Sequence, residues 1–180
     1  MSGPPIESDL PAEQLQPSRI AKMRWLKQWW PVLAWASLIS WLSTGTFTAE
    51  NTGKIIIPIL RWIFSTASPE TLLSLHYLIR KSGHFVEYFV LSLLILRALR
   101  AGRQRSRLGW AFMAIALVAG YAALDEFHQS FVPGRTASVA DVLLDTAGGI
   151  AAQILAALVT LLGDVRARGR AGKVPPAATT

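Results

Sequence analysis

The sequence has 180 residues, of which 52% are hydrophobic and only 16% are charged. Soluble domains carry about 25% charged residues, so this composition favours an integral membrane protein. The absence of cysteine excludes disulfides and thiolate metal sites. The formal net charge of +7 would suit nucleic-acid binding, but the placement of the basic residues argues against that function, as shown below.

Four apolar runs follow one another along the chain, and each can be extended to the about 20 residues that a membrane-spanning helix requires. They cover residues 29–47, 85–99, 108–124 and 139–162. A long polar lead precedes the first run, and bulky Phe47 stands where a cleavable signal needs a small residue, so we expect a retained span. The predicted fold class is all-α, an integral membrane bundle of four transmembrane helices.

The two ends of the chain differ from this apolar core. Residues 1–18 are rich in proline and lack an apolar period, which predicts a disordered tail. Residues 164–180 end in VPPAATT and predict a flexible cytoplasmic tail. Residues 19–163 are therefore expected to form one membrane domain.

Two shorter elements are predicted between the first and second runs. Residues 54–64, KIIIPILRWIF, are apolar but too short to span and are interrupted by Pro58, which predicts an amphipathic segment in the membrane interface. A helix should then begin with Ser68 as its N-cap and Pro69 at its first position. Gly83 predicts a bend between this helix and the second span.

Lysine and arginine are distributed unevenly around the four runs. Basic residues collect on the cytoplasmic side of membrane proteins, so both termini are expected in the cytoplasm of a bacterial-type inner membrane. One side carries Arg19, Lys22, Arg24, Lys27, Arg97, Arg100, Arg103, Arg105, Arg107, Arg166, Arg168, Arg170 and Lys173, and the other only Lys54, Arg61, Arg80, Lys81 and Arg135. The positive charge is thus a signal of topology, and no nucleic-acid partner is expected.

Polar residues gather at the predicted outer ends of the last three spans, in groups whose members share a helix face. The groups are His84, Glu87 and Tyr88 on the second span, Tyr121, Asp125, His128 and Gln129 on the third, and Asp141 and Asp145 on the fourth. A carboxylate costs about 3 kcal/mol at the centre of a bilayer and less near its surface. We therefore expect these groups to meet and to pair with Lys81 and Arg135.

Two histidine–carboxylate pairs leave several roles open. His84 with Glu87, and Asp125 with His128, stand three residues apart, a spacing that holds metal ions in helical bundles. The same residues would suit general acid–base catalysis. We favour a fixed network of hydrogen bonds and ion pairs that binds a ligand headgroup, with neither a metal nor a cofactor.

Some of the polar and small residues also have structural explanations. Pro133 and Gly134 are typical of a tight turn, and Ser138–Asp141 fits a capping box at the start of the fourth span. Gly148 and Gly149 are small enough to permit close helix packing.

Two long motifs resemble the VanZ-like family of small integral membrane proteins. They are RKSGHFVEYFVLSLL in the second span and DEFHQSFVPGRTASVADVLLDTAGG across the third and fourth, within a resemblance that covers about residues 30–162. The family pattern falls on Lys81, His84, Glu87, Tyr88, Asp125, Glu126, Gln129, Pro133, Gly134, Arg135, Asp141, Asp145 and Gly148. The family takes its name from a protein associated with resistance to the glycopeptide teicoplanin, so the resemblance implies a setting in the cell envelope.

The leading hypothesis is a protein that acts at the outer face of the cytoplasmic membrane. Its polar cluster would bind a lipid headgroup, a lipid-linked envelope precursor or a glycopeptide-type antibiotic, with Arg135 contacting the anion. One alternative is an intramembrane enzyme that uses an acid–base or metal site built from His84, Glu87, Asp125 and His128. Another is a small proton or solute carrier, since buried carboxylates and histidines also form relays.

Overall fold

The computed structural model describes residues 12–100, 107–135 and 137–171, and these residues form helices and short connections without any strand. The predicted all-α class is therefore confirmed. The elements are α1 (Ala12–Leu42), the short 3-10 helix η2 (Gly45–Phe47), α2 (Ala49–Ile63), α3 (Pro69–Arg100), α4 (Arg107–Gln129) and α5 (Val139–Ala171).

Three helices in the described part of the chain, α3, α4 and α5, are by themselves long and apolar enough to cross a membrane. The stretch Met23–Leu42 of α1 meets the same criterion together with Gly45–Ile63, from which it is bent by 60°. The protein therefore has three candidate spans, or four if the bent pair crosses as one broken span.

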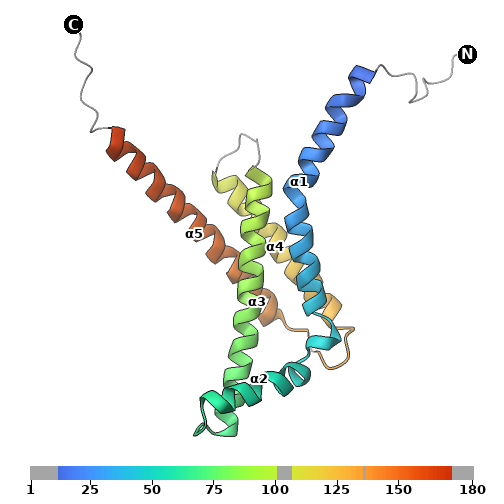
Figure 1. Ribbon diagram of the computed structural model, residues 1–180, viewed down its shortest axis with the longest axis vertical. Coiled ribbons are helices and arrows are strands. Elements are labelled where there is room, and N and C mark those ends of the chain that lie inside the picture. Colours follow the sequence, from blue (N-terminus) through green and yellow to red (C-terminus); the bar gives the residue numbers. More distant parts are fainter. Residues whose placement is uncertain (1–11, 101–106, 136, 172–180) are drawn as a thin grey trace, which may run out of the picture.

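α3 runs through the middle of the molecule, with α1, α4 and α5 packed around it (Figure 1). The start of α1, the end of α3, the start of α4 and the end of α5 all lie at one end of the bundle. α2 crosses the first part of α3 at the opposite end, which we call the α2 end. The connection between α4 and α5 lies at the α2 end too, beside η2.

Close packing between helices depends on two adjacent glycines of α5. A Cβ atom at Gly148 would lie 2.4 Å from the carbonyl oxygen of Phe85 on α3. A Cβ atom at Gly149 would lie 2.7 Å from a methyl carbon of Val118 on α4. Both distances are shorter than real contacts allow, so the expectation that these glycines permit close helix packing is confirmed.

Buried hydrogen bonds join α3 and α5 at the same crossing. Ser92 Oγ donates a hydrogen bond to the Gly149 carbonyl at 3.0 Å. Gln153 Nε2 donates to Ser92 Oγ at 2.7 Å and to the Ser92 carbonyl at 3.2 Å. Hydrogen bonds of this kind hold membrane helices in a fixed register, because lipid offers the polar atoms no alternative partner.

The course of α3 differs from the sequence prediction at Gly83. The expected bend is absent, and α3 continues unbroken through Gly83 from Pro69 to Arg100. A glycine inside a helix costs only about 1 kcal/mol relative to alanine, which the packing of the helix on both sides can offset. The start of α3 is as predicted, since Ser68 Oγ accepts the backbone N–H of Thr71 at 3.3 Å.

The helices also extend further than predicted at three places. Pro58 lies within α2 and does not break it. α1 begins at Ala12, so residues 12–18 are helical where a disordered tail was expected, and residues 1–11 lie outside the described part. α5 continues to Ala171, beyond the predicted domain end at residue 163. Alanine, glutamine, leucine and arginine are strong helix formers, and they prolong helices that the spans have already nucleated.

Candidate functional site

Arg135 joins the end of α1 to the connection between α4 and α5. Its Nη2 donates hydrogen bonds to the carbonyl oxygens of Leu42 at 2.8 Å and Phe47 at 3.0 Å, and its Nη1 donates to Gln129 Oε1 at 3.0 Å. The last carbonyls of a helix have no partner within the helix, and the guanidinium supplies one here. Gly134, with φ of 78°, turns the chain just before Arg135, as the Pro-Gly pair predicts.

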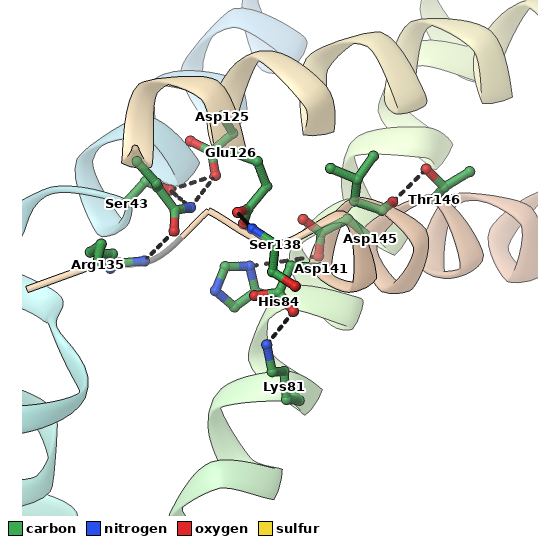
Figure 2. A network of polar contacts seen from close by, with 12 residues as sticks. Ser43, Lys81, His84, Asp125, Glu126, Arg135, Ser138, Asp141, Asp145 and Thr146 are labelled. Carbon is green, nitrogen blue, oxygen red and sulfur yellow. Dashed lines mark hydrogen bonds and ion pairs between the residues drawn. The ribbon is translucent and has the colours of Figure 1, made fainter. Parts of the chain in front are cut away.

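Asp125 is buried and belongs to the same network (Figure 2). Its Oδ2 accepts hydrogen bonds from Ser43 Oγ at 2.7 Å and from Gln129 Nε2 at 2.9 Å. Gln129 therefore links the Asp125 carboxylate to the Arg135 guanidinium. Arg135 forms no ion pair with a carboxylate of the described residues, so it is not the direct counter-ion that one reading of the sequence suggested.

The start of α5 is held differently from the predicted capping box. The N–H of Asp141 donates to the backbone carbonyl of Ser138, not to its hydroxyl group. The N–H of Ser138 donates to Glu126 Oε2 at 2.8 Å, and Asp141 forms an ion pair with Lys81 on α3. The Glu126 carboxylate thus accepts the Ser138 N–H that a capping box would leave to Asp141, and the Asp141 carboxylate pairs with Lys81 instead.

His84 on α3 faces Asp145 on α5. The distance from His84 Nδ1 to Asp145 Oδ1 is 3.6 Å, and Asp145 is fully buried. Figure 2 shows the imidazole with one nitrogen toward this carboxylate and the other directed away from it. Tyr88, one turn further along α3, is also fully buried. The His84 ring therefore lies beside the Asp145 carboxylate at ion-pair distance, without a hydrogen bond between them.

Arg80 is a member of the site that the sequence analysis did not single out. Its Nη1 donates to the Phe47 carbonyl at 3.0 Å and to Thr52 Oγ1 at 2.9 Å. Phe47 therefore accepts hydrogen bonds from two guanidinium groups, those of Arg80 and Arg135. The available signal was helical spacing, since Arg80 precedes His84 by four residues and so shares its face.

Two adjoining cavities meet at these cations. The first, which we call the apolar cavity, has a volume of 170 Å³ and is lined mostly by apolar groups, among them Leu42, Phe47, Ile56 and Ile79. The second, the polar cavity, has a volume of 300 Å³ and is lined in part by Tyr77, Lys81, Gln129 and Asp141. The side chains common to both are those of Arg80, His84 and Arg135.

Carboxyl groups lie near the two arginines without pairing with them: Glu87 lines the apolar cavity, and Asp141, paired with Lys81, lines the polar cavity. Burial lowers the pKa of Arg135, and the carboxyl groups of Asp125 and Glu126 only oppose that shift. Arginine stays protonated in proteins because its pKa starts above about 12. Neither Arg80 nor Arg135 has an ion-pair partner within the described ranges. Both guanidinium groups therefore border the cavities without a direct counter-ion, in the company of the Glu87 and Asp141 carboxyl groups.

The four residues considered for catalysis or metal binding are not gathered at one point. Glu87 lines the apolar cavity with His84. His128 is exposed and lines a separate hollow of 150 Å³ beside Asp125 and Tyr121. Over the described parts of the chain, no group of three or more histidine, aspartate or glutamate side chains is arranged to hold a metal ion.

Comparison with known proteins places the chain in a family. Neither the curated proteins nor the solved structures contain a match to it. The family model VanZ/LLP1, however, matches residues 23–160, which include the bent pair, all of α3 and α4, and most of α5. The matched region also contains every residue that lines the two cavities. The chain is therefore a multi-span membrane protein that belongs to the VanZ/LLP1 family.

Proposed function

We propose that this protein binds the anionic headgroup of a membrane amphiphile at the outer face of the cytoplasmic membrane. The observation that carries the proposal is the meeting of Arg80 and Arg135 on one carbonyl oxygen, that of Phe47, at the boundary of two cavities. The amphiphile is a lipid, a lipid-linked envelope precursor or an amphiphilic glycopeptide antibiotic.

Two guanidinium groups held this close repel each other, and a bound anion between them relieves the repulsion. Arginine suits this role because its planar fork donates two parallel hydrogen bonds to a phosphate or carboxylate. Arg80 uses only Nη1 for hydrogen bonds to described residues, so its remaining N–H groups are free to face a ligand. Lys81 also lines the polar cavity, where the ion pair with Asp141 offsets its positive charge.

The distribution of basic residues supports the outer face as the place of binding. The site lies at the α2 end, whereas Arg97, Arg100, Arg166 and Arg168 belong to the opposite ends of α3 and α5. Arginine-rich ends favour the cytoplasmic side. The site end would then face outward.

A topology experiment tests this orientation. A reporter fused after Thr180, or inserted near Arg103, is expected to lie in the cytoplasm, and one near Ala67 is expected to lie outside. The measurement is the accessibility of single cysteines to a membrane-impermeant label in intact cells, which the cysteine-free sequence allows. Labelling at position 103 combined with protection at position 67 would reverse the orientation and contradict the proposal.

A binding experiment tests the anion site. Arg80→Gln and Arg135→Lys are each expected to weaken binding of phosphatidylglycerol by about tenfold, because each variant loses a fork that holds the phosphate. The matched control is Lys54→Gln, which removes one positive charge from an exposed residue of α2 whose partners among the described residues are Glu50 and Asn51. Binding is measured by native mass spectrometry of the purified protein. Unchanged affinity in both arginine variants would refute the proposal.

The pair formed by His84 and Asp145 favours a second candidate, an enzyme that acts on the same headgroup. A histidine beside a buried carboxylate and exposed to a cavity is suited to act as a general base. This candidate predicts that the purified protein slowly hydrolyses bound phosphatidylglycerol and that His84→Gln stops the reaction without abolishing binding. Product formation that is equal in His84→Gln and in the unaltered protein would exclude it.

A further inference from the structure

We infer that the ligand is a lipid whose phosphate links an apolar chain to a hydroxyl-bearing head, as in a phosphodiester or diphosphate lipid. This inference rests on the proposed function and names the class of ligand for the same site. Its basis is the order of the two cavities, which share Arg80, His84 and Arg135 and no other residue. A ligand that fills both cavities must carry its negative charge between an apolar part and a polar part.

The apolar cavity suits the first part of a lipid chain. Leu42, Ile56 and Ile79 contribute its apolar lining, and it opens between α1, α2 and α3. Gly83 lines the same cavity, and a Cβ atom at this position would meet no atom of the described residues within 4 Å. The absence of a side chain at Gly83 therefore keeps space open on the face of α3 that also carries His84 and Glu87.

The shared boundary suits a phosphate. Arg80 and Arg135 supply two positive charges, and the His84 nitrogen that faces away from Asp145 supplies a further polar contact. An anion in this position is held by side chains from α3 and from the connection between α4 and α5 at once. Oxygen atoms on several sides of a phosphorus atom match this arrangement better than the two oxygens of a carboxylate do.

The polar cavity suits a head that both donates and accepts hydrogen bonds. Lys81 is a donor, Asp141 is an acceptor, and Gln129 offers both kinds of group. At 300 Å³ the cavity reaches the lower end of the range, about 300–1,000 Å³, that small-molecule sites occupy. A bare phosphate would leave it unfilled, and a choline head has no N–H or O–H to donate to Asp141. A glycerol or sugar hydroxyl can bond to all three side chains.

Binding of four ligands tests separately whether the site uses the chain, the phosphate and the hydroxylated head. The ligands are phosphatidylglycerol, which has chain, phosphate and hydroxylated head; phosphatidic acid, which lacks the head; phosphatidylcholine, whose head cannot donate; and glycerophosphoglycerol, which lacks the chains. We expect phosphatidylglycerol to bind about tenfold more tightly than each of the others by native mass spectrometry of the detergent-purified full chain. Equal binding of phosphatidic acid would show that the polar cavity is unused, and would overturn the inference.

A cavity-filling variant tests the position of the chain. Gly83→Leu is expected to fold, because leucine is the better helix former and its Cβ meets no neighbour. It should weaken binding of phosphatidylglycerol by about tenfold and leave binding of glycerophosphoglycerol unchanged. The control is Gly120→Leu on α4, where a Cβ also meets nothing within 4 Å and no lining residue of either cavity is altered.

The outcomes distinguish this inference from the proposed function. If Arg80→Gln weakens lipid binding but Gly83→Leu does not, the anion site stands and the assignment of the apolar cavity is wrong. If glycerophosphoglycerol binds as tightly as phosphatidylglycerol, the site serves a free phosphate ester and the assignment to a lipid is wrong. If neither Arg80→Gln nor Gly83→Leu changes binding, both the inference and the proposed function fail.

Discussion

Replacing Gly148 with alanine is expected to destabilise the protein by about 1–3 kcal/mol or to prevent its folding. The added methyl group would lie 2.4 Å from the Phe85 carbonyl oxygen. This oxygen belongs to the backbone of α3, so it cannot move away as a flexible side chain could. α5 would have to shift from α3, and the hydrogen bonds that join Ser92, Gly149 and Gln153 would lengthen with it.

Gly163→Ala provides the matched control on the same helix, since a Cβ atom there meets no atom within 4 Å in the described part of the chain. Helix propensity alone would make both substitutions stabilising, because alanine is the better helix former. The temperature of unfolding in detergent and the yield of monodisperse protein measure the difference. Equal unfolding temperatures for Gly148→Ala and Gly163→Ala would mean that α3 and α5 do not cross at this distance.

Arg135→Ala is expected to destabilise the protein by about 2–4 kcal/mol, the second large effect. The substitution removes the donors to the Leu42 and Phe47 carbonyls and to Gln129 Oε1 together. A half-buried acceptor left without a partner costs more than the hydrogen bond itself contributes. The loss should release the end of α1 from the turn that contains Gly134.

Arg135→Lys separates this structural role from ligand binding. A lysine ammonium group can still donate to backbone carbonyls, so the folded yield should recover at least in part, whereas two-pronged contact with an anion is lost. Thermal unfolding without denaturant measures the loss of stability, and limited proteolysis near residue 45 detects whether the end of α1 has separated from the connection that contains Arg135. An alanine variant as stable as the unaltered protein would show that these hydrogen bonds do not hold the connection in place.

Much of the architecture could be predicted from the sequence, because apolar length and basic residues carry the information about membrane spans. The second, third and fourth predicted apolar runs lie within α3, α4 and α5, the three helices that are long and apolar enough to span a membrane. The meeting of His84, Asp125, Asp141 and Asp145 at one end follows from placing each group at the same end of its span. The packing role of Gly148 could be predicted because small residues in transmembrane helices commonly mark places where two helices approach closely.

The details of the site depended on contacts that no local pattern encodes. Ser43 binds Asp125 across 82 positions of the chain, and nothing in its surroundings marks it as a partner. Arg135 was expected to meet either carboxylates or a ligand, and its hydrogen bonds to the backbone carbonyls that end α1 and η2 were not foreseen. The continuity of α3 through Gly83 was missed because helix propensity is weak compared with the packing of α3 against α2 and α5.

Because α3 is one unbroken helix, it connects the α2 end of the molecule rigidly to the rest of the bundle. Its 32 residues extend about 48 Å at 1.5 Å per residue, whereas the hydrocarbon core of a bilayer is about 30 Å thick. The first part of α3 packs against α2 and is joined to it by a hydrogen bond between His76 and Thr52. Lys81 and His84 lie where α3 first contacts α5, at Asp141 and Asp145, and Arg80 lies just before them. Because Arg80, Lys81 and His84 stand on one continuous helix, a displacement of this part of α3 would move all three side chains together.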